Sequence, residues 1–201
     1  RVRTERPVPA RRPSRDARHA VGALAAIGGL LLGPPARAAR AQCTANTATC
    51  RVATLAGASA VTVGNFDGVH RGHQALIGEA VKAARARGLP AGVMIFEPHP
   101  REFFHPKESH FRLTPIEQKI AVFETLGLDF VVVVPFDAEL AKLEHFEFVD
   151  DVLAQGLDVR HVVKRYDFYY GRQRRGSPES MILAGIEYDF EGTVVPPVSD
   201  G

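Results

Sequence analysis

The stretch that decides the fold of this 201-residue sequence is Gly64-Asn65-Phe66-Asp67-Gly68-Val69-His70-Arg71-Gly72-His73. It follows a short apolar run at 60–63 and precedes a segment, 74–81, whose apolar residues have helical spacing. This order predicts a buried strand, a glycine-rich loop and a helix with both histidines in its first turn. The N-terminus of a helix favours anions through its free N–H groups and its dipole. The stretch therefore predicts a phosphate-binding loop, in which His70 and His73 donate hydrogen bonds to phosphate oxygens.

Strand and helix signals alternate along the rest of the chain. Strands are expected at 60–63, 91–96, 129–134, 160–163 and 192–198, and helices at 71–87, 114–127, 146–155 and from Ser177 onward. Alternation with short connections predicts an α/β fold with a parallel sheet and helices on both of its faces. Ligands in such sheets bind beyond the carboxyl ends of the strands, where the His70 loop lies.

Two local patterns make sharper predictions. Thr114, followed by Pro115 and a glutamate three residues after the threonine, is typical of a helix N-cap with a capping box. Three prolines at 98, 100 and 106 predict an irregular loop. The histidines at 99, 105 and 110 with Glu102 match no familiar zinc spacing. A solvated loop is therefore favoured over a metal site, and Phe103 and Phe104 are expected either to cover an aromatic ligand or to pack in the core.

The phosphate loop resembles the His-x-Gly-His signature of the nucleotidylyltransferase superfamily. Its longer form, Gly-Asn-Phe-Asp-Gly-Val-His-x-Gly-His, is similar to that of the prokaryotic FAD synthetases, in which an FMN adenylyltransferase is usually fused to a riboflavin kinase. The resemblance runs from about residue 51 to 201. It is carried further by Phe96-Glu97-Pro98-His99-Pro100, Arg112-Leu113-Thr114, Lys119, Pro135-Phe136-Asp137, Leu140-Ala141, His161-Val162-Val163, Tyr166-Asp167-Phe168, Gly171 and Arg174.

This resemblance implies a Rossmann-like nucleotidylyltransferase fold and the transfer of AMP from ATP to FMN, which gives FAD and pyrophosphate. It implies Mg²⁺ as cofactor, His70, His73 and Asp167 as catalytic residues, and Asp167 as the metal ligand. The substrate-binding residues it implies are Gly64, Asn65, Phe66, Asp67, Gly68, Gly72, Pro98, His99, Pro100, Phe168 and Arg174.

Several of these assignments have alternatives. Asn65 and Asp67 are equally typical of short polar side chains that cap a loop. Asp167 can instead form a salt bridge with the arginines that follow it. The chain also departs from the family: Lys164-Arg165 replaces a usual glycine position, so bulk at Arg165 is expected to obstruct a ligand.

A Ser-Ser-Thr-x-x-Arg segment and the riboflavin kinase domain of the family are not found in the sequence. We therefore expect residues 51–201 to be a C-terminally incomplete adenylyltransferase domain that turns over poorly. Two other functions stay open: a nucleotide- or flavin-binding fragment without turnover, and a nucleotidylyltransferase with another phosphorylated acceptor.

Residues 1–50 are predicted to be a leader rich in arginine, alanine and proline that is disordered or signal-like. An apolar run at 21–32 is shaped like a secretory signal and is too short to span a bilayer. Because ATP and FMN are cytosolic, a cytoplasmic location is favoured over export. Residues 1–42 carry a formal charge of +7 and the remainder −5. The −5 charge argues against nucleic acid as a partner, and no membrane partner is expected.

Overall fold

The computed structural model describes residues 37–40, as backbone only, and residues 58–197. Both ranges belong to the second of the two units into which the chain divides, Pro34–Gly201. They form one six-stranded sheet, in which every pair of neighbouring strands is parallel. In spatial order the strands are β1 (Arg37–Arg40), β4 (Phe130–Pro135), β3 (Ala91–Glu97), β2 (Ser59–Val63), β5 (Val159–Arg165) and β6 (Glu191–Val195).

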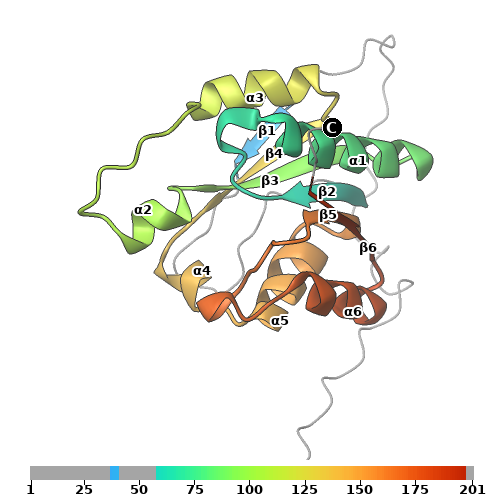
Figure 1. Cartoon of the computed structure of the whole chain (residues 1–201). Helices are drawn as coiled ribbons and strands as arrows, with labels where there is room; N and C mark the ends of the chain where they lie inside the picture. Colours follow the sequence, from blue (N-terminus) through green and yellow to red (C-terminus); the bar gives the residue numbers. More distant parts are fainter. Residues whose placement is uncertain (1–36, 41–57, 198–201) are drawn as a thin grey trace, which may run out of the picture. The chain divides into compact units, whose positions relative to one another are not determined.

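Helices cover both faces of this sheet (Figure 1). On one face, α1 (Arg71–Ala86) and α3 (Ile116–Thr125) bury Ile77 and Phe123 against valines of the strands. On the other, α6 (Pro178–Tyr188) and the π-helix η3 (Phe148–Gly156) bury Met181 and Leu153. The predicted α/β fold, with a parallel sheet between two helical layers, is confirmed.

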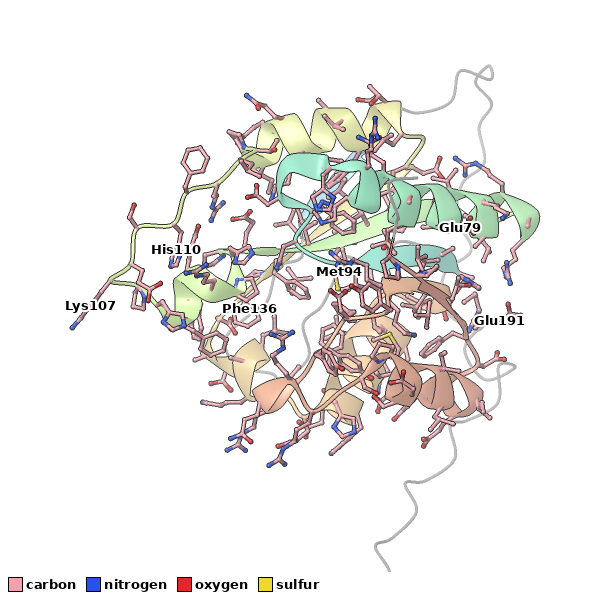
Figure 2. The ribbon with its side chains drawn as sticks, in the orientation of Figure 1. Glu79, Met94, Lys107, His110, Phe136 and Glu191 are labelled. Atoms are coloured by element: carbon pink, nitrogen blue, oxygen red, sulfur yellow. The ribbon has the colours of Figure 1, made fainter. Side chains whose placement is uncertain are left out.

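The remaining elements are short, and most lie around the carboxyl ends of the strands. They are the 3₁₀ turns η2 (Asp67–Val69) and η4 (Arg172–Arg174), and the helices α2 (Pro100–Phe104), α4 (Ala138–Lys142) and α5 (His145–Glu147). Met94 lies inside the fold on β3, whereas Lys107 and His110 lie on the extended connection between α2 and α3 (Figure 2).

Three local predictions are wrong. The irregular loop at 98–106 contains α2, since His99 Nδ1 accepts a hydrogen bond from the backbone N–H of Arg101 and starts a helical turn. The helix predicted at 146–155 begins one residue earlier, and most of it is the π-helix η3. Thr114 is not the N-cap of α3: Pro115 takes that position, because the Thr114 hydroxyl accepts a hydrogen bond from Gly68 N–H instead.

Strand β1 lies within the range 1–50 that the sequence predicts as a leader, where no strand was expected. It pairs in parallel with β4, with Arg37 opposite Phe130. The other residues of the predicted leader lie outside the described ones, so the leader stays a prediction. Among the described residues, no helix combines the length and apolar character needed to span a membrane.

Candidate active site

The loop between β2 and α1 is held in shape by bonds to the segment before α3. The carboxylate of Asp67 accepts hydrogen bonds from the backbone N–H groups of Leu113 and Thr114, both at 3.1 Å. Burial raises the pKa of Asp67, but these bonds outweigh it and leave the pKa below its ordinary value. Gly68, at φ +74°, approaches Leu113 so closely that a Cβ would lie 2.9 Å from its side chain. Asp67 and Gly68 therefore join two loops, as the loop-capping alternative for Asp67 predicts.

His70 and His73 stack on each other at the start of α1. Their ring centroids are 3.7 Å apart, and His70 is the N-cap residue of the helix. Burial lowers the pKa of His73 to about 4, with further lowering by the charges of His70 and Arg165. His73 is therefore neutral at pH 7. Its Nδ1 is buried and has no hydrogen-bond partner among the described residues.

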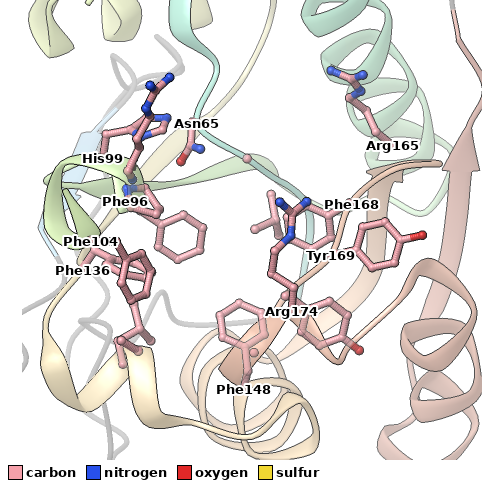
Figure 3. Close-up of a pocket in the computed structure, with 18 of the residues that line it drawn as sticks. Asn65, Phe96, His99, Phe104, Phe136, Phe148, Arg165, Phe168, Tyr169 and Arg174 are labelled. Carbon is pink, nitrogen blue, oxygen red and sulfur yellow. Dashed lines mark hydrogen bonds between the residues drawn. The ribbon is translucent and has the colours of Figure 1, made fainter. Parts of the chain in front are cut away.

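A cavity of about 910 Å³ opens where β2, β3, β4 and β5 end, next to His73 (Figure 3). Much of its lining is aromatic, and we call this part the aromatic wall: Phe96 packs edge-on against Phe136, at 6.0 Å between centroids, and Phe168 stacks on Tyr170 at 5.7 Å. Phe104 contributes to the same wall, and Phe103 packs behind it. The aromatic wall is suited to a flat, conjugated ring system.

Polar side chains make up the rest of the lining, which we call the polar wall. The side-chain oxygen of Asn65, Oδ1, is buried and has no hydrogen-bond partner among the described residues. The backbone carbonyl of Asn65 accepts a hydrogen bond from Lys119 Nζ. Arg174 lies over the ring of Tyr169, 5.6 Å from its centroid. Burial lowers the pKa of His99, which also lines this wall.

A second hollow of about 420 Å³ lies on the other side of Arg165. It is formed by the first turn of α1, from His70 to Gly72, and by Val195 and Pro196 at the end of β6. Gly72 packs against His70 so closely that a Cβ would lie 3.2 Å from the imidazole. A side chain at position 72 would therefore crowd the His70 ring.

The structure brings most of the predicted site residues together. Those that line the large cavity are Gly64, Asn65, Phe66, Asp67, His73, His99, Pro100, Asp167, Phe168 and Arg174. His70 and Gly72 line the smaller hollow, whereas Gly68 and Pro98 line neither of these two. Phe66 is 1% exposed and packs against His73 and Phe123, so it supports the histidine from the core.

Part of the aromatic wall is not predicted from the sequence as a site, namely Phe96, Phe136, Phe148, Tyr169 and Tyr170. Phe96 and Phe136 each end or follow a strand, which is where ligands of parallel sheets bind. That position was the available signal for both. Phe148 and Tyr170 carry no such signal, because in the sequence they look like ordinary core residues.

Asp167 binds Arg165 rather than the arginines that follow it. The distance between Arg165 Nη2 and Asp167 Oδ2 is 2.8 Å. Among the described residues, no group of three or more His, Cys, Asp or Glu side chains is placed to hold a metal ion. The donor set fits Mg²⁺ only as a metal that arrives with a polyphosphate, for which a single carboxylate such as Asp167 suffices.

A parallel sheet, a histidine-bearing loop at a helix N-terminus and a cavity at the strand ends define the nucleotidylyltransferase class of Rossmann-like folds. The sequence profile described as FAD synthetase matches residues 53–201. The chain belongs to the FAD synthetase family.

Curated relatives carry the name bifunctional riboflavin kinase/FMN adenylyltransferase. The protein from Escherichia coli (strain K12) is 38% identical over 141 residues, which cover 70% of this chain and 45% of the relative. That from Bacillus subtilis (strain 168) is 40% identical over 124 residues, covering 61% and 39%. The chain thus spans less than half the length of these relatives.

Among solved structures, the chain is similar to one titled macrolide-efflux protein from Streptococcus pneumoniae. The TM-score is 0.66 at 26% identity, over 76% of this chain and 50% of that one. This likeness supports the fold through a solved structure as well as through sequence.

Proposed function

We propose that this site transfers AMP from ATP to FMN, giving FAD and pyrophosphate. The observation that carries the proposal is that aromatic and polar side chains line one 910 Å³ cavity beside the N-terminus of α1. An isoalloxazine ring suits the aromatic wall, and phosphates suit the helix terminus. The names of the curated relatives support the same reaction.

In this reaction an oxygen of the FMN phosphate attacks the α-phosphorus of ATP. The new bond joins that oxygen to the α-phosphorus, and the bond from the α-phosphorus to the bridging oxygen breaks, so that pyrophosphate leaves with the electron pair. A phosphate monoester is already largely ionised at pH 7, so no general base is needed. The protein has to align two anions and stabilise the charge on the oxygens.

Three residues of the site have different roles in this reaction, according to where they lie. His73 is neutral and its half-buried side chain lines the cavity, so it acts as a positioned hydrogen-bond donor to phosphate. Arg174, on the loop after β5, adds positive charge at the aromatic end. Asp167 is the carboxylate that would hold Mg²⁺ bound to ATP, and the ion would neutralise phosphate charge there.

ATP and FMN are cytosolic metabolites, so we place this reaction in the cytoplasm. The negative charge of the chain beyond residue 42 disfavours nucleic acid as an alternative partner. Another phosphorylated acceptor is the second candidate, since the polar wall would accept any phosphate monoester. The aromatic wall is what favours FMN over such an acceptor.

The test is to incubate the chain with ATP, Mg²⁺ and FMN and to follow FAD and pyrophosphate by chromatography. FMN should bind at least tenfold more tightly than ribose 5-phosphate, which has the phosphate without the ring. FMN binding without any FAD formation would identify a binding module. Equal affinity for the two phosphates would contradict the flavin assignment.

A further inference from the structure

Arg165 is the charged residue that connects the two hollows of the site. It ends β5, and among the described residues it is the only one that lines both the large cavity and the small hollow. Its side chain points toward α1, away from the aromatic wall (Figure 3). The bulk that the sequence suggested would obstruct a ligand therefore lies between the two hollows.

The small hollow is suited to an anion. The first N–H groups of an α-helix have no partner within the helix, and the His70 side chain does not cap those of α1. Two arginines, Arg71 and Arg165, line the same hollow. The apolar side of the small hollow consists of Val195, Pro196 and Pro197, which carry no negative charge that would repel an anion.

The present ion-pair partner of Arg165, Asp167, can be replaced easily by a ligand. Its ion pair with Asp167 is largely open to water, since the two side chains are 38% and 45% exposed. Exposed pairs of this kind contribute only about 0–1 kcal/mol, so a polyphosphate can replace Asp167 at little cost. The planar guanidinium fits two phosphate oxygens at once. The positive charge of Arg165 also lowers the pKa of His73, so it acts on the phosphate loop from its present position.

We propose that Arg165 binds the polyphosphate of the nucleotide in the small hollow and stabilises the negative charge of the departing pyrophosphate. The proposal rests on the adenylyl transfer proposed above and assigns it a further substrate-binding residue. Arg165 keeps its protons throughout and contributes charge and geometry alone. The base and α-phosphate then lie toward the large cavity, and the two terminal phosphates toward α1 and β6.

Binding measurements on the chain of residues 1–201 test this residue independently of turnover. The probes are inorganic pyrophosphate and ATP without metal, titrated by calorimetry, and FMN, titrated by quenching of its fluorescence. Arg165→Gln should weaken pyrophosphate and ATP at least tenfold and leave FMN within twofold. Arg165→Lys should recover part of the loss, since it keeps the charge but not the paired geometry.

Arg160→Gln is the matched control. Arg160 lies at the other end of the same strand and forms a similar ion pair, 2.9 Å from Asp158. This variant should bind all three probes like the parent. Pyrophosphate and ATP affinities of Arg165→Gln within twofold of the parent would overturn the proposal, as would a parent chain that does not bind pyrophosphate.

Should Arg165→Gln fail to fold, parental affinity for pyrophosphate in Arg165→Lys would overturn the proposal equally. An absence of FAD formation, with pyrophosphate binding that depends on Arg165, would reject the adenylyl transfer and retain the polyphosphate site.

Discussion

His73 is the residue on which the proposed reaction depends most directly. With a pKa of about 4 it is neutral at pH 7, so in the proposed reaction it would stabilise phosphate as a hydrogen-bond donor of fixed position. Removing one such donor from an active site costs roughly a hundredfold to a thousandfold in rate. We therefore expect His73→Ala to reduce FAD formation about a hundredfold, and His70→Ala to do the same. Initial rates at saturating ATP and FMN measure both.

His110→Ala is the control, because His110 lies on the connection between α2 and α3 and lines neither hollow. It should keep the parental rate. Rates near the parent's in both loop variants would remove these histidines from the mechanism.

The same histidine affects stability at acid pH. Its pKa in the folded protein, about 4, is below the ordinary value of 6.5, so the unfolded chain binds more protons between these values. The parent should lose stability as the pH falls from about 6.5 to 4, and His73→Ala should lose less. Urea unfolding at several pH values measures the difference, and equal losses in both proteins would contradict the burial of His73.

At this scale the sequence predicts well which residues of the loop between β2 and α1 lie together, and it predicts the aromatic wall poorly. The loop is contiguous, so Asn65, Asp67 and His73 are visible together in one motif. The wall combines Phe96, Phe148 and their neighbours from separate segments, and only the folded sheet brings them together. Arg165 is visible as an unusual residue, but its side relative to the sheet depends on strand register.

At the scale of elements, the loop after β5 depends on one glycine. Gly171 has φ +72°, and a Cβ there would lie 2.6 Å from the Cα of His145, at the start of α5. Alanine is strained at this φ and would push the loop away from the helix. We expect Gly171→Ala to lower the free energy of unfolding by roughly 2 kcal/mol. FMN should bind more weakly, because Phe168 and Arg174 lie on either side of this residue.

Gly78→Ala is the opposite case. Gly78 lies inside α1, and a Cβ there would meet nothing within 4 Å. Alanine should raise the free energy of unfolding by about 0.5–1 kcal/mol, because it reduces the freedom of the unfolded chain. Chemical denaturation measures both glycine variants. A stable Gly171→Ala with parental FMN affinity would show that the loop has another conformation.

The long elements were predictable because each carries a complete apolar pattern. Strands β3 and β4 are apolar runs, and α1 repeats its apolar residues with helical period. The short helices were not, since α2 and α4 have five residues each and start on a local side-chain bond. In α4 that bond is the Asp137 carboxylate, which accepts from the N–H groups of Glu139 and Leu140.

At the scale of the whole molecule, β5 sends two consecutive basic residues to opposite sides of the sheet, as strand geometry requires. Arg165 reaches the site beside α1, whereas Lys164 is fully buried on the side of α6. The ammonium of Lys164 has no hydrogen-bond partner among the described residues. Burial lowers its pKa to about 8, although the charge of Glu179 opposes this. The site therefore gains one cation while the core holds another at a cost in stability.

Because of Lys164, the free energy of unfolding of the whole fold should change with pH in the alkaline range. Because its pKa is about 8 in the folded chain and 10.5 in the unfolded one, the unfolded chain binds more protons between these values, so stability should rise with pH across this window. The shift corresponds to an upper bound of about 3 kcal/mol against the folded state at neutral pH. Lys164→Met keeps the length of the side chain and removes the charge, so it should raise the melting temperature by roughly 5–10 °C at pH 7.

The gain from Lys164→Met should shrink as the pH approaches 10, because the parent lysine is then neutral in the folded state. Lys82→Met is the control, since the Lys82 side chain is 75% exposed and its removal should change the melting temperature little. Thermal unfolding of the three proteins between pH 7 and 10 decides the matter. A Lys164→Met variant less stable than the parent at pH 7 would show that the ammonium has a partner that compensates its burial.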